Sequence, residues 1–225
     1  MTERIRDALF AMQDPGYREF QARLMPTVKK ERIIGVRIPA LRRYAKGLAG
    51  TEEAKRFMEE LPHAYYEEDN LHAFLIEQLG ELEATVEVLD RFLPYVDNWA
   101  TCDSTSPRCF SKYPQELLPH ALRWMAAEEP YAVRFGIGVL MKHYLGAHFC
   151  DDLPARVASV QREEYYINMM VAWYFATALA VRYDEILPYI KERRLRPWIH
   201  QKTIQKAVES NRLTREQKNE LRQFR

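Results

Sequence analysis

Aromatic residues recur along this chain at an almost constant interval, and this period constrains the possible folds more than any other feature. Tyr66, Trp99, Tyr131, Tyr165 and Trp198 follow one another at steps of 33, 32, 34 and 33 residues. The dipeptide Leu-Pro recurs over the same stretch, beginning at positions 61, 93, 118, 153 and 187. A fixed period of roughly 20 to 50 residues is typical of stacked repeats. The chain is therefore expected to be an array of similar units.

Each unit reads as two helices. In residues 117–145, LLPHALRWMAAEEPYAVRFGIGVLMKHYL, Pro119 is expected in the first turn of a helix, where a missing N–H is tolerated. The sequence Glu-Glu-Pro at 128–130 ends that helix, and Tyr131 opens the next. Residues 152–180 repeat the plan. Their second helix, 165–180, is apolar nearly all round, which predicts burial between neighbouring layers.

Further helices are predicted upstream, over residues 2–12, 15–25, 39–48, 52–61 and 69–79, with Thr51 as a cap. No alternating strand pattern longer than a few residues is present. The predicted fold is all-α, a HEAT- or armadillo-like superhelix of antiparallel helix pairs, in one domain over residues 1–225. The concave surface of such a stack suits an elongated ligand, either duplex nucleic acid or a peptide.

The composition agrees with a helical protein. Hydrophobic residues make up 47% and charged residues 29%, which excludes bulk disorder, and only 8 Gly and 12 Pro leave little material for a sandwich or barrel. No stretch approaches the roughly 18 apolar residues of a membrane span, and the first residues lack a signal peptide's apolar run, so a cytoplasmic protein is expected. The three cysteines show no CxxC pattern, and reduced thiols are expected.

The net charge of +1 conceals an uneven distribution. Residues 1–46 contain 11 Lys and Arg against 5 Asp and Glu, and residues 182–225 contain 12 against 6. The middle of the chain therefore carries a net charge of −11. Basic ends on either side of an acidic centre are consistent with contact to a polyanion, or simply with solvated helix faces.

Several kinds of chemistry lack their motifs. No phosphate-binding loop of either common type is present, and Gly136 and Gly138 are interpreted as packing glycines inside a helix. The six histidines include no H-E-x-x-H, and no ligand pattern indicates a metal site. We therefore expect neither a metal nor a nucleotide cofactor.

The segment YVDNWATCDSTSPRCF, residues 95–110, has an unusual composition. It places Trp99 and Asp103 four residues apart, so that an indole and a carboxylate share one helical face. The alternative interpretation is structural, with Trp99 as the packing aromatic of its repeat and Asp103 as a cap or surface residue.

Two more residues stand at comparable places in the following repeats. Arg134 lies among apolar residues, where a charged side chain needs an anion or solvent, and Trp173 lies in the segment MMVAWYFATA. Taken alone, an arginine such as Arg134 is more often ion-paired and a tryptophan such as Trp173 is more often part of the core. Together with Trp99 and Asp103, they form a candidate site on successive repeats.

These residues resemble a known family, the AlkD-type DNA alkylation repair enzymes, which are HEAT-like repeat glycosylases that act on alkylated purines. The similar segments are GVRIPALRRYAK, NWATCD, YAVRFGIGVLMKHYL and NMMVAWYFATALA. The resemblance implies a monomer that hydrolyses the N-glycosidic bond of cationic N3- or N7-alkylpurines in duplex DNA without a cofactor. It implies that Asp103 is catalytic, that Trp99 and Trp173 line the lesion cleft, and that Arg134 lies near the DNA backbone.

The N-terminal part departs from members of the family with demonstrated excision. Those carry a short extra helix with an aromatic residue that presses into the duplex, whereas here Leu24 stands at that position and Pro26 is expected to end the helix. The sequence resembles a branch that lacks this element. Phosphate contacts are instead expected from basic residues near the N-terminus. These are Lys29, Lys30, Arg32, Arg37, Arg42 and Arg43.

Two alternatives stay open at this point. The chain is then either a non-catalytic repeat module that binds nucleic acid or protein and retains the cleft residues, or a purely structural repeat protein. The second alternative predicts that Trp99, Trp173 and Asp103 are buried apart from one another.

Overall fold

The computed structural model describes residues 2–225, and the side chains from residue 3 onward. This part of the chain folds into fourteen α-helices and three short 3-10 helices, and it contains no β-strand, only an isolated bridge between Gln13 and Val36. The prediction of an all-α protein is confirmed. The chain divides into two compact units, the first ending at Tyr113 and the second beginning at Pro114.

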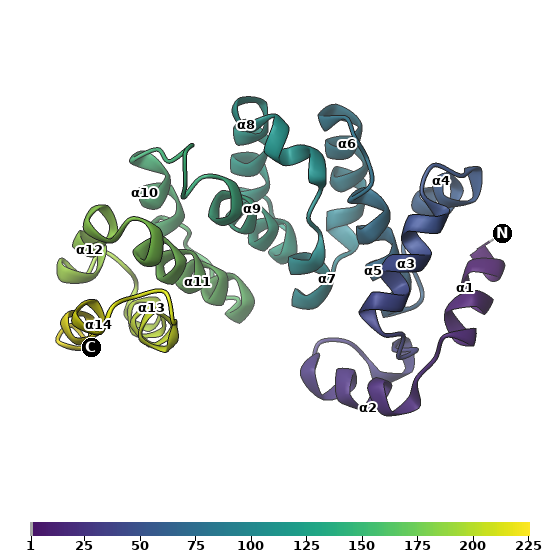
Figure 1. Ribbon diagram of the computed structural model, residues 1–225, viewed down its shortest axis with the longest axis horizontal. Coiled ribbons are helices and arrows are strands. Elements are labelled where there is room, and N and C mark those ends of the chain that lie inside the picture. The colour runs from purple at the N-terminus through teal and green to yellow at the C-terminus, as the bar shows by residue number, and fades with distance from the viewer. Residues whose placement is uncertain (1) are drawn as a thin grey trace. The chain divides into compact units, whose positions relative to one another are not determined.

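The first unit contains seven α-helices and all three 3-10 helices (Figure 1). They are α1 (Thr2–Ala11), α2 (Pro15–Leu24), η1 (Lys30–Arg32), α3 (Ile38–Leu48), α4 (Glu52–Glu59), α5 (Tyr66–Ile76), α6 (Leu82–Phe92), η2 (Leu93–Tyr95), α7 (Trp99–Ser104) and η3 (Arg108–Lys112). Helix α5 lies between α3 and α7 and also contacts α4 and α6. It is the centre of this unit, and all of its residues are buried.

The buried face of α5 includes charged residues, which the sequence analysis did not anticipate. The carboxylate of Glu67 accepts hydrogen bonds from the backbone N–H groups of Ile34, Gly35 and Val36, at 2.8, 2.7 and 3.2 Å. The carboxylate of Glu68 accepts hydrogen bonds from the backbone N–H groups of Ala64 and Tyr65, just before the helix. The helix begins at Tyr66, three residues before the predicted start at Asp69. The predicted start at Asp69 is wrong because these carboxylates have partners that allow them to be helical and buried.

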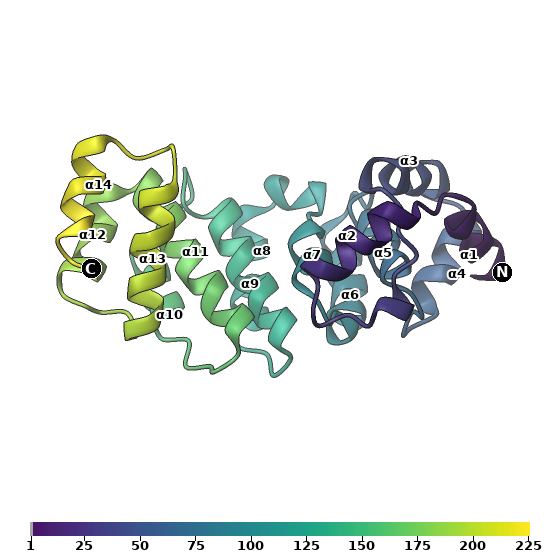
Figure 2. The same ribbon diagram turned by 90° about the horizontal axis from the view of Figure 1, so that it is seen from below.

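The second unit contains seven helices in two layers. They are α8 (Pro114–Met125), α9 (Pro130–His143), α10 (Asp152–Ala158), α11 (Tyr165–Val181), α12 (Tyr183–Lys191), α13 (Pro197–Glu209) and α14 (Arg215–Arg222). Helices α9, α11 and α13 lie side by side in chain order (Figure 2), and α8, α12 and α14 pack against them. The predicted burial of α11 is correct only in part: nine of its 17 residues are buried, whereas Tyr165, Trp173 and Val181 are exposed.

One detail of the predicted repeat is wrong. Pro119 does not lie in the first turn of its helix but inside α8, which begins at Pro114. Pro114 itself occupies the start, where the missing N–H costs nothing, and the helix then continues through Pro119. The role of Gly136 as a packing glycine is supported, because a β-carbon there would lie 2.4 Å from the backbone nitrogen of Met125 on α8.

No helix in the described part of the chain is long and apolar enough to cross a membrane. Cys102 and Cys109 are buried, Cys150 is exposed, and all three are free thiols.

Candidate functional site

Helix α7 holds two of the predicted site residues and is fixed at its start by a buried polar network. The side chain of Asn98 caps the helix by accepting a hydrogen bond from the N–H of Thr101 at 2.8 Å. The hydroxyl of Thr101 donates in turn to Asn70 on α5, at 2.9 Å. Since Asn98, Thr101 and Asn70 are all buried, this network sets the rotation of α7 and therefore the direction of its exposed face.

Trp99 opens α7 and is half-buried. Its ring packs against an apolar cluster formed by Met25, Val28, Ile33 and Tyr66. Its indole N–H donates to the backbone carbonyl of Leu24, with a distance of 3.4 Å between Nε1 and the oxygen. Trp99 therefore has a packing role at the end of α2, and the rest of its ring faces solvent.

Asp103 lies near the other end of α7 and is also half-buried. It is not the cap of this helix, because Asn98 holds that place. A carboxylate in the last turn of a helix is opposed by the partial negative charge of the helix end. The helix dipole therefore does not favour an aspartate there, and Asp103 shares its helix face with Trp99.

Arg134 lies on α9 and is buried, with 5% of its surface exposed. Its guanidinium donates from Nη1 to the backbone carbonyl of Tyr166, at 2.6 Å. A buried guanidinium needs polar partners, and one partner of Arg134 is this carbonyl at the start of α11. The contact links the two neighbouring helices and fixes the position of the positive charge.

Trp173 lies on α11 and is 40% exposed, so its interpretation as a core residue is wrong. The residues at i+3, i+4 and i+7 from it on the same helix face are Ala176, Thr177 and Ala180, whose small side chains leave a hollow. Small side chains on one helix face also allow a neighbouring helix to pack closely, so the local sequence does not show that this face stays open. The opening depends on where α13 lies.

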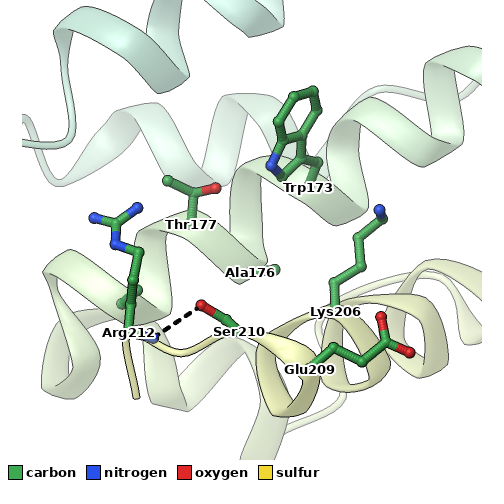
Figure 3. Close-up of a pocket in the computed structure, with 8 residues that line it drawn as sticks. Trp173, Ala176, Thr177, Lys206, Glu209, Ser210 and Arg212 are labelled. Atoms are coloured by element: carbon green, nitrogen blue, oxygen red, sulfur yellow. Dashed lines mark hydrogen bonds between the residues drawn. The ribbon is translucent and has the colours of Figure 1, made fainter.

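The hollow beside Trp173 is a pocket of about 310 Å³ (Figure 3). Its other wall comes from the end of α13 and the loop after it, which contribute Lys206, Glu209, Ser210 and Arg212. The indole and the Lys206 side chain stand over the same opening, with the hydroxyl of Thr177 between the indole and Arg212. The pocket thus combines an aromatic face with two cations, two hydroxyls and the carboxylate of Glu209. Two cations against one carboxylate leave it weakly positive.

The predicted site residues thus fall into two pairs. Trp99 and Asp103 share α7 in the first unit, whereas Arg134 and Trp173 lie on the neighbouring helices α9 and α11 of the second.

The basic residues predicted to contact phosphates differ in whether they form ion pairs within the protein. Arg32 is half-buried and donates to Asp69 and Asp97, Arg37 pairs with Asp14, and Lys30 pairs with Glu19. Arg42 pairs with Glu77, a largely buried carboxylate. Lys29 and Arg43 are exposed and form no ion pair with any residue that the structure describes.

Among carboxyl and imidazole groups, the strongest pKa shifts lie outside α7, α9 and α11. Burial raises the pKa of Asp69 well above its usual range, against the opposing charge of Arg32. Burial lowers the pKa of His63 to about 4 and that of His72 well below its usual value. Among the described residues, no group of three or more His, Cys, Asp or Glu side chains is arranged to hold a metal ion.

The described part of the chain is thus an all-α protein of two compact units, with Trp99 and Asp103 on α7 of the first unit and Arg134 and Trp173 on α9 and α11 of the second. Its sequence matches the profile of the family described as DNA alkylation repair enzyme over residues 5–216. The chain belongs to this family. No curated protein matches it.

Proposed function

We propose that this protein is a DNA glycosylase of the alkylation repair type, which hydrolyses the N-glycosidic bond of cationic N3- or N7-alkylpurines in duplex DNA. Membership of the DNA alkylation repair family across residues 5–216 carries this proposal. It is supported by an indole and a carboxylate, Trp99 and Asp103, on one partly exposed face of α7.

The architecture that we propose for this function is a HEAT-like superhelix. In its support, α9, α11 and α13 form one layer of the second unit and α8, α12 and α14 cover it. In the first unit α3, α5 and α7 follow one another in the same manner. We propose that both units form a single repeat domain that acts as a monomer in the cytoplasm.

This hydrolysis requires few catalytic groups because the substrate is already activated. An alkylated purine carries a positive charge, so the bond between its N9 and the sugar C1′ is weak. When that bond breaks, its electron pair neutralises the purine and positive charge develops on the sugar. The carboxylate of Asp103 stabilises this charge and orients the attacking water. The water oxygen bonds to C1′, and its proton passes to Asp103 and then to solvent.

The remaining residues are proposed to hold the nucleotide. Trp99 and Trp173 contact the cationic lesion through their rings, an arrangement favourable for a cation over an indole. Arg134 fixes a backbone phosphate, and its anchor on the carbonyl of Tyr166 keeps its charge in place. This reaction needs no metal and no cofactor.

The direct test measures the release of 7-methylguanine and 3-methyladenine from methylated duplex DNA. We expect Asp103→Asn to lower the rate about 100- to 1,000-fold, the usual cost of losing one group that stabilises charge in a transition state. Asp184→Asn is the matched control because Asp184 is an exposed aspartate on α12, outside the candidate site. Its rate is expected to equal that of the wild type.

A second candidate function is a module that binds DNA or protein without catalysis. It is favoured by the packing of Trp99 against the end of α2 and by the exposed Leu24, with α2 ending just before Pro26. If the wild type and Asp103→Asn are equally inert over long incubation, the glycosylase proposal is lost and this second function takes its place.

A further inference from the structure

The first unit contains a second groove, which lies apart from Trp99. Its walls are the second half of α3, the end of α5 and the first residue of η3, and its volume is about 290 Å³. The residues that line it are Arg42, Arg43, Lys46, Phe74, Glu77, Gln78 and Arg108. Four of these seven side chains are cationic, and one is acidic.

The acidic member does not neutralise the groove. Glu77 is 4% exposed and its carboxylate is bound by Arg42, whose guanidinium also lies 4.0 Å from the centre of the Phe74 ring. Arg42 is therefore held in place by an ion pair and an aromatic face. Because Glu77 is paired with Arg42, the charges of Arg43, Lys46 and Arg108 make the groove net positive.

Arg43, Lys46 and Arg108 are exposed, and none of them forms an ion pair with a residue that the structure describes. Three like charges around one groove repel one another, so this arrangement gives nothing to the stability of the fold. Contact with an external polyanion removes the repulsion. Of the basic residues predicted to contact phosphates, only Arg42 and Arg43 belong to this groove. Arg108 could not be grouped with them because it is remote in sequence, whereas Lys46 lies only three residues after Arg43 on α3 and was left out of the predicted set.

The lining indicates what kind of anion fits. Sites for small organic ligands are lined mostly by apolar and aromatic residues and enclose their ligand, whereas six of the seven residues that line this groove are polar or charged. Arginine forks match the geometry of phosphate oxygens. We propose that this groove binds adjacent backbone phosphates of a DNA strand, and thereby anchors the duplex on the first unit. The choice of DNA as the polymer depends on the proposed function.

The test measures binding of an undamaged fluorescent duplex by anisotropy at several salt concentrations, so that excision plays no part in the result. The triple variant Arg43→Gln, Lys46→Gln, Arg108→Gln is compared with the wild type. The control triple variant is Lys112→Gln, Arg215→Gln, Lys218→Gln, which removes the same charge from residues outside the groove that also lack ion pairs. Circular dichroism confirms that both variants are folded.

We expect the groove variant to bind roughly 10- to 100-fold more weakly at low salt, and its salt slope to fall in magnitude by about 2.7, since each of the three lost phosphate contacts contributes about 0.9. The control variant is expected to keep the wild-type slope. Equal losses in both variants, or a wild type that binds no duplex at low salt, overturn the proposal.

Two further arms separate other ligands and the enzymatic proposal. If a deoxynucleoside monophosphate or a polyglutamate peptide binds the groove as tightly as the duplex, the groove is not a DNA site. Duplex binding that depends on the groove, together with no base release, retains this inference and rejects the glycosylase. If bases are released but the groove variant keeps the wild-type salt slope, the glycosylase proposal is retained and the groove inference is rejected.

Discussion

At the scale of single residues, buried polar groups hold segments of the first unit in place beside its apolar core. Glu67 holds the backbone of residues 34–36 through three N–H groups, and this segment contains Gly35 with a φ of +95°. A β-carbon on Gly35 would lie 2.7 Å from the carbonyl oxygen of Asp14. Burial raises the pKa of Glu67, and the three amide donors oppose that rise. The segment therefore depends on a carboxylate that comes from a distant helix.

A pair of buried histidines gives a prediction for the effect of pH. Nε2 of His63 lies 2.9 Å from Nδ1 of His72, and the rings stack on Phe57 and Phe92. Burial lowers the pKa of His63 to about 4, so the folded protein keeps this ring neutral while the unfolded chain binds a proton below about pH 6.5. The free energy of unfolding is therefore expected to fall by roughly 3 kcal/mol as the pH drops from 6.5 to 4, for His63 alone.

This prediction is checked by urea unfolding across that pH range. His63→Gln keeps a group that hydrogen-bonds His72 but does not titrate, and it is expected to flatten the pH dependence. His120→Gln is the control, because His120 is half-exposed on α8. A pH profile of His63→Gln as steep as that of the wild type would contradict the prediction.

At the scale of secondary-structure elements, the contact between α8 and α9 depends on one glycine. At Gly136 a β-carbon would lie 2.4 Å from the Met125 nitrogen and 2.7 Å from the Ala121 carbonyl oxygen, both rigid backbone atoms. Gly136→Ala is expected to lower the free energy of unfolding by about 2 kcal/mol, because the two helices must separate. Thermal and urea unfolding measure this loss.

Gly138 provides the matched control on the same helix. Its β-carbon would meet only the Met170 Cε at 3.6 Å, which is ordinary contact. Gly138→Ala is therefore expected to be neutral or to stabilise the protein by up to about 1 kcal/mol through helix propensity. Similar losses for the two variants would show that close approach of α8 is not the reason for the glycine.

Element positions could be predicted from the sequence where one periodic pattern decides them. The apolar helix predicted at 165–180 and the cap predicted at Thr51 follow from local sequence, and both are present, the helix as Tyr165–Val181. The start of α5 could not be predicted in this way, since residues 66–70 read as a surface segment until Arg6, Arg32 and the amides of residues 34–36 are known to meet them.

The same reason limits the prediction of the candidate site. The spacing of Trp99 and Asp103 is local, and both do lie on α7. The exposure of Trp173 depends instead on what α13 leaves uncovered, and the groove around Lys46 joins residues from three elements. Such surfaces are set by packing between distant segments, which the repeat period does not encode.

At the scale of the whole molecule, the division into two compact units predicts that the second unit folds alone. It has roughly 110 residues, enough to bury a core of its own. Its core joins α9, α11 and α13 through fully buried residues such as Leu140, Phe175 and Ile204. A polypeptide of residues 114–225 is therefore expected to show helical circular dichroism and one cooperative thermal transition.

A shorter polypeptide of residues 130–225, without α8, is the control for that experiment. Helix α8 covers α9 closely, and its Trp124 packs edge-on against Phe135 with 5.1 Å between the ring centres. Without α8 that apolar face is open to water, so the shorter polypeptide is expected to bind a hydrophobic dye and to lose the cooperative transition. If residues 114–225 also melt without cooperativity, the second unit depends on the first for its fold, and the boundary at Tyr113 has no thermodynamic meaning.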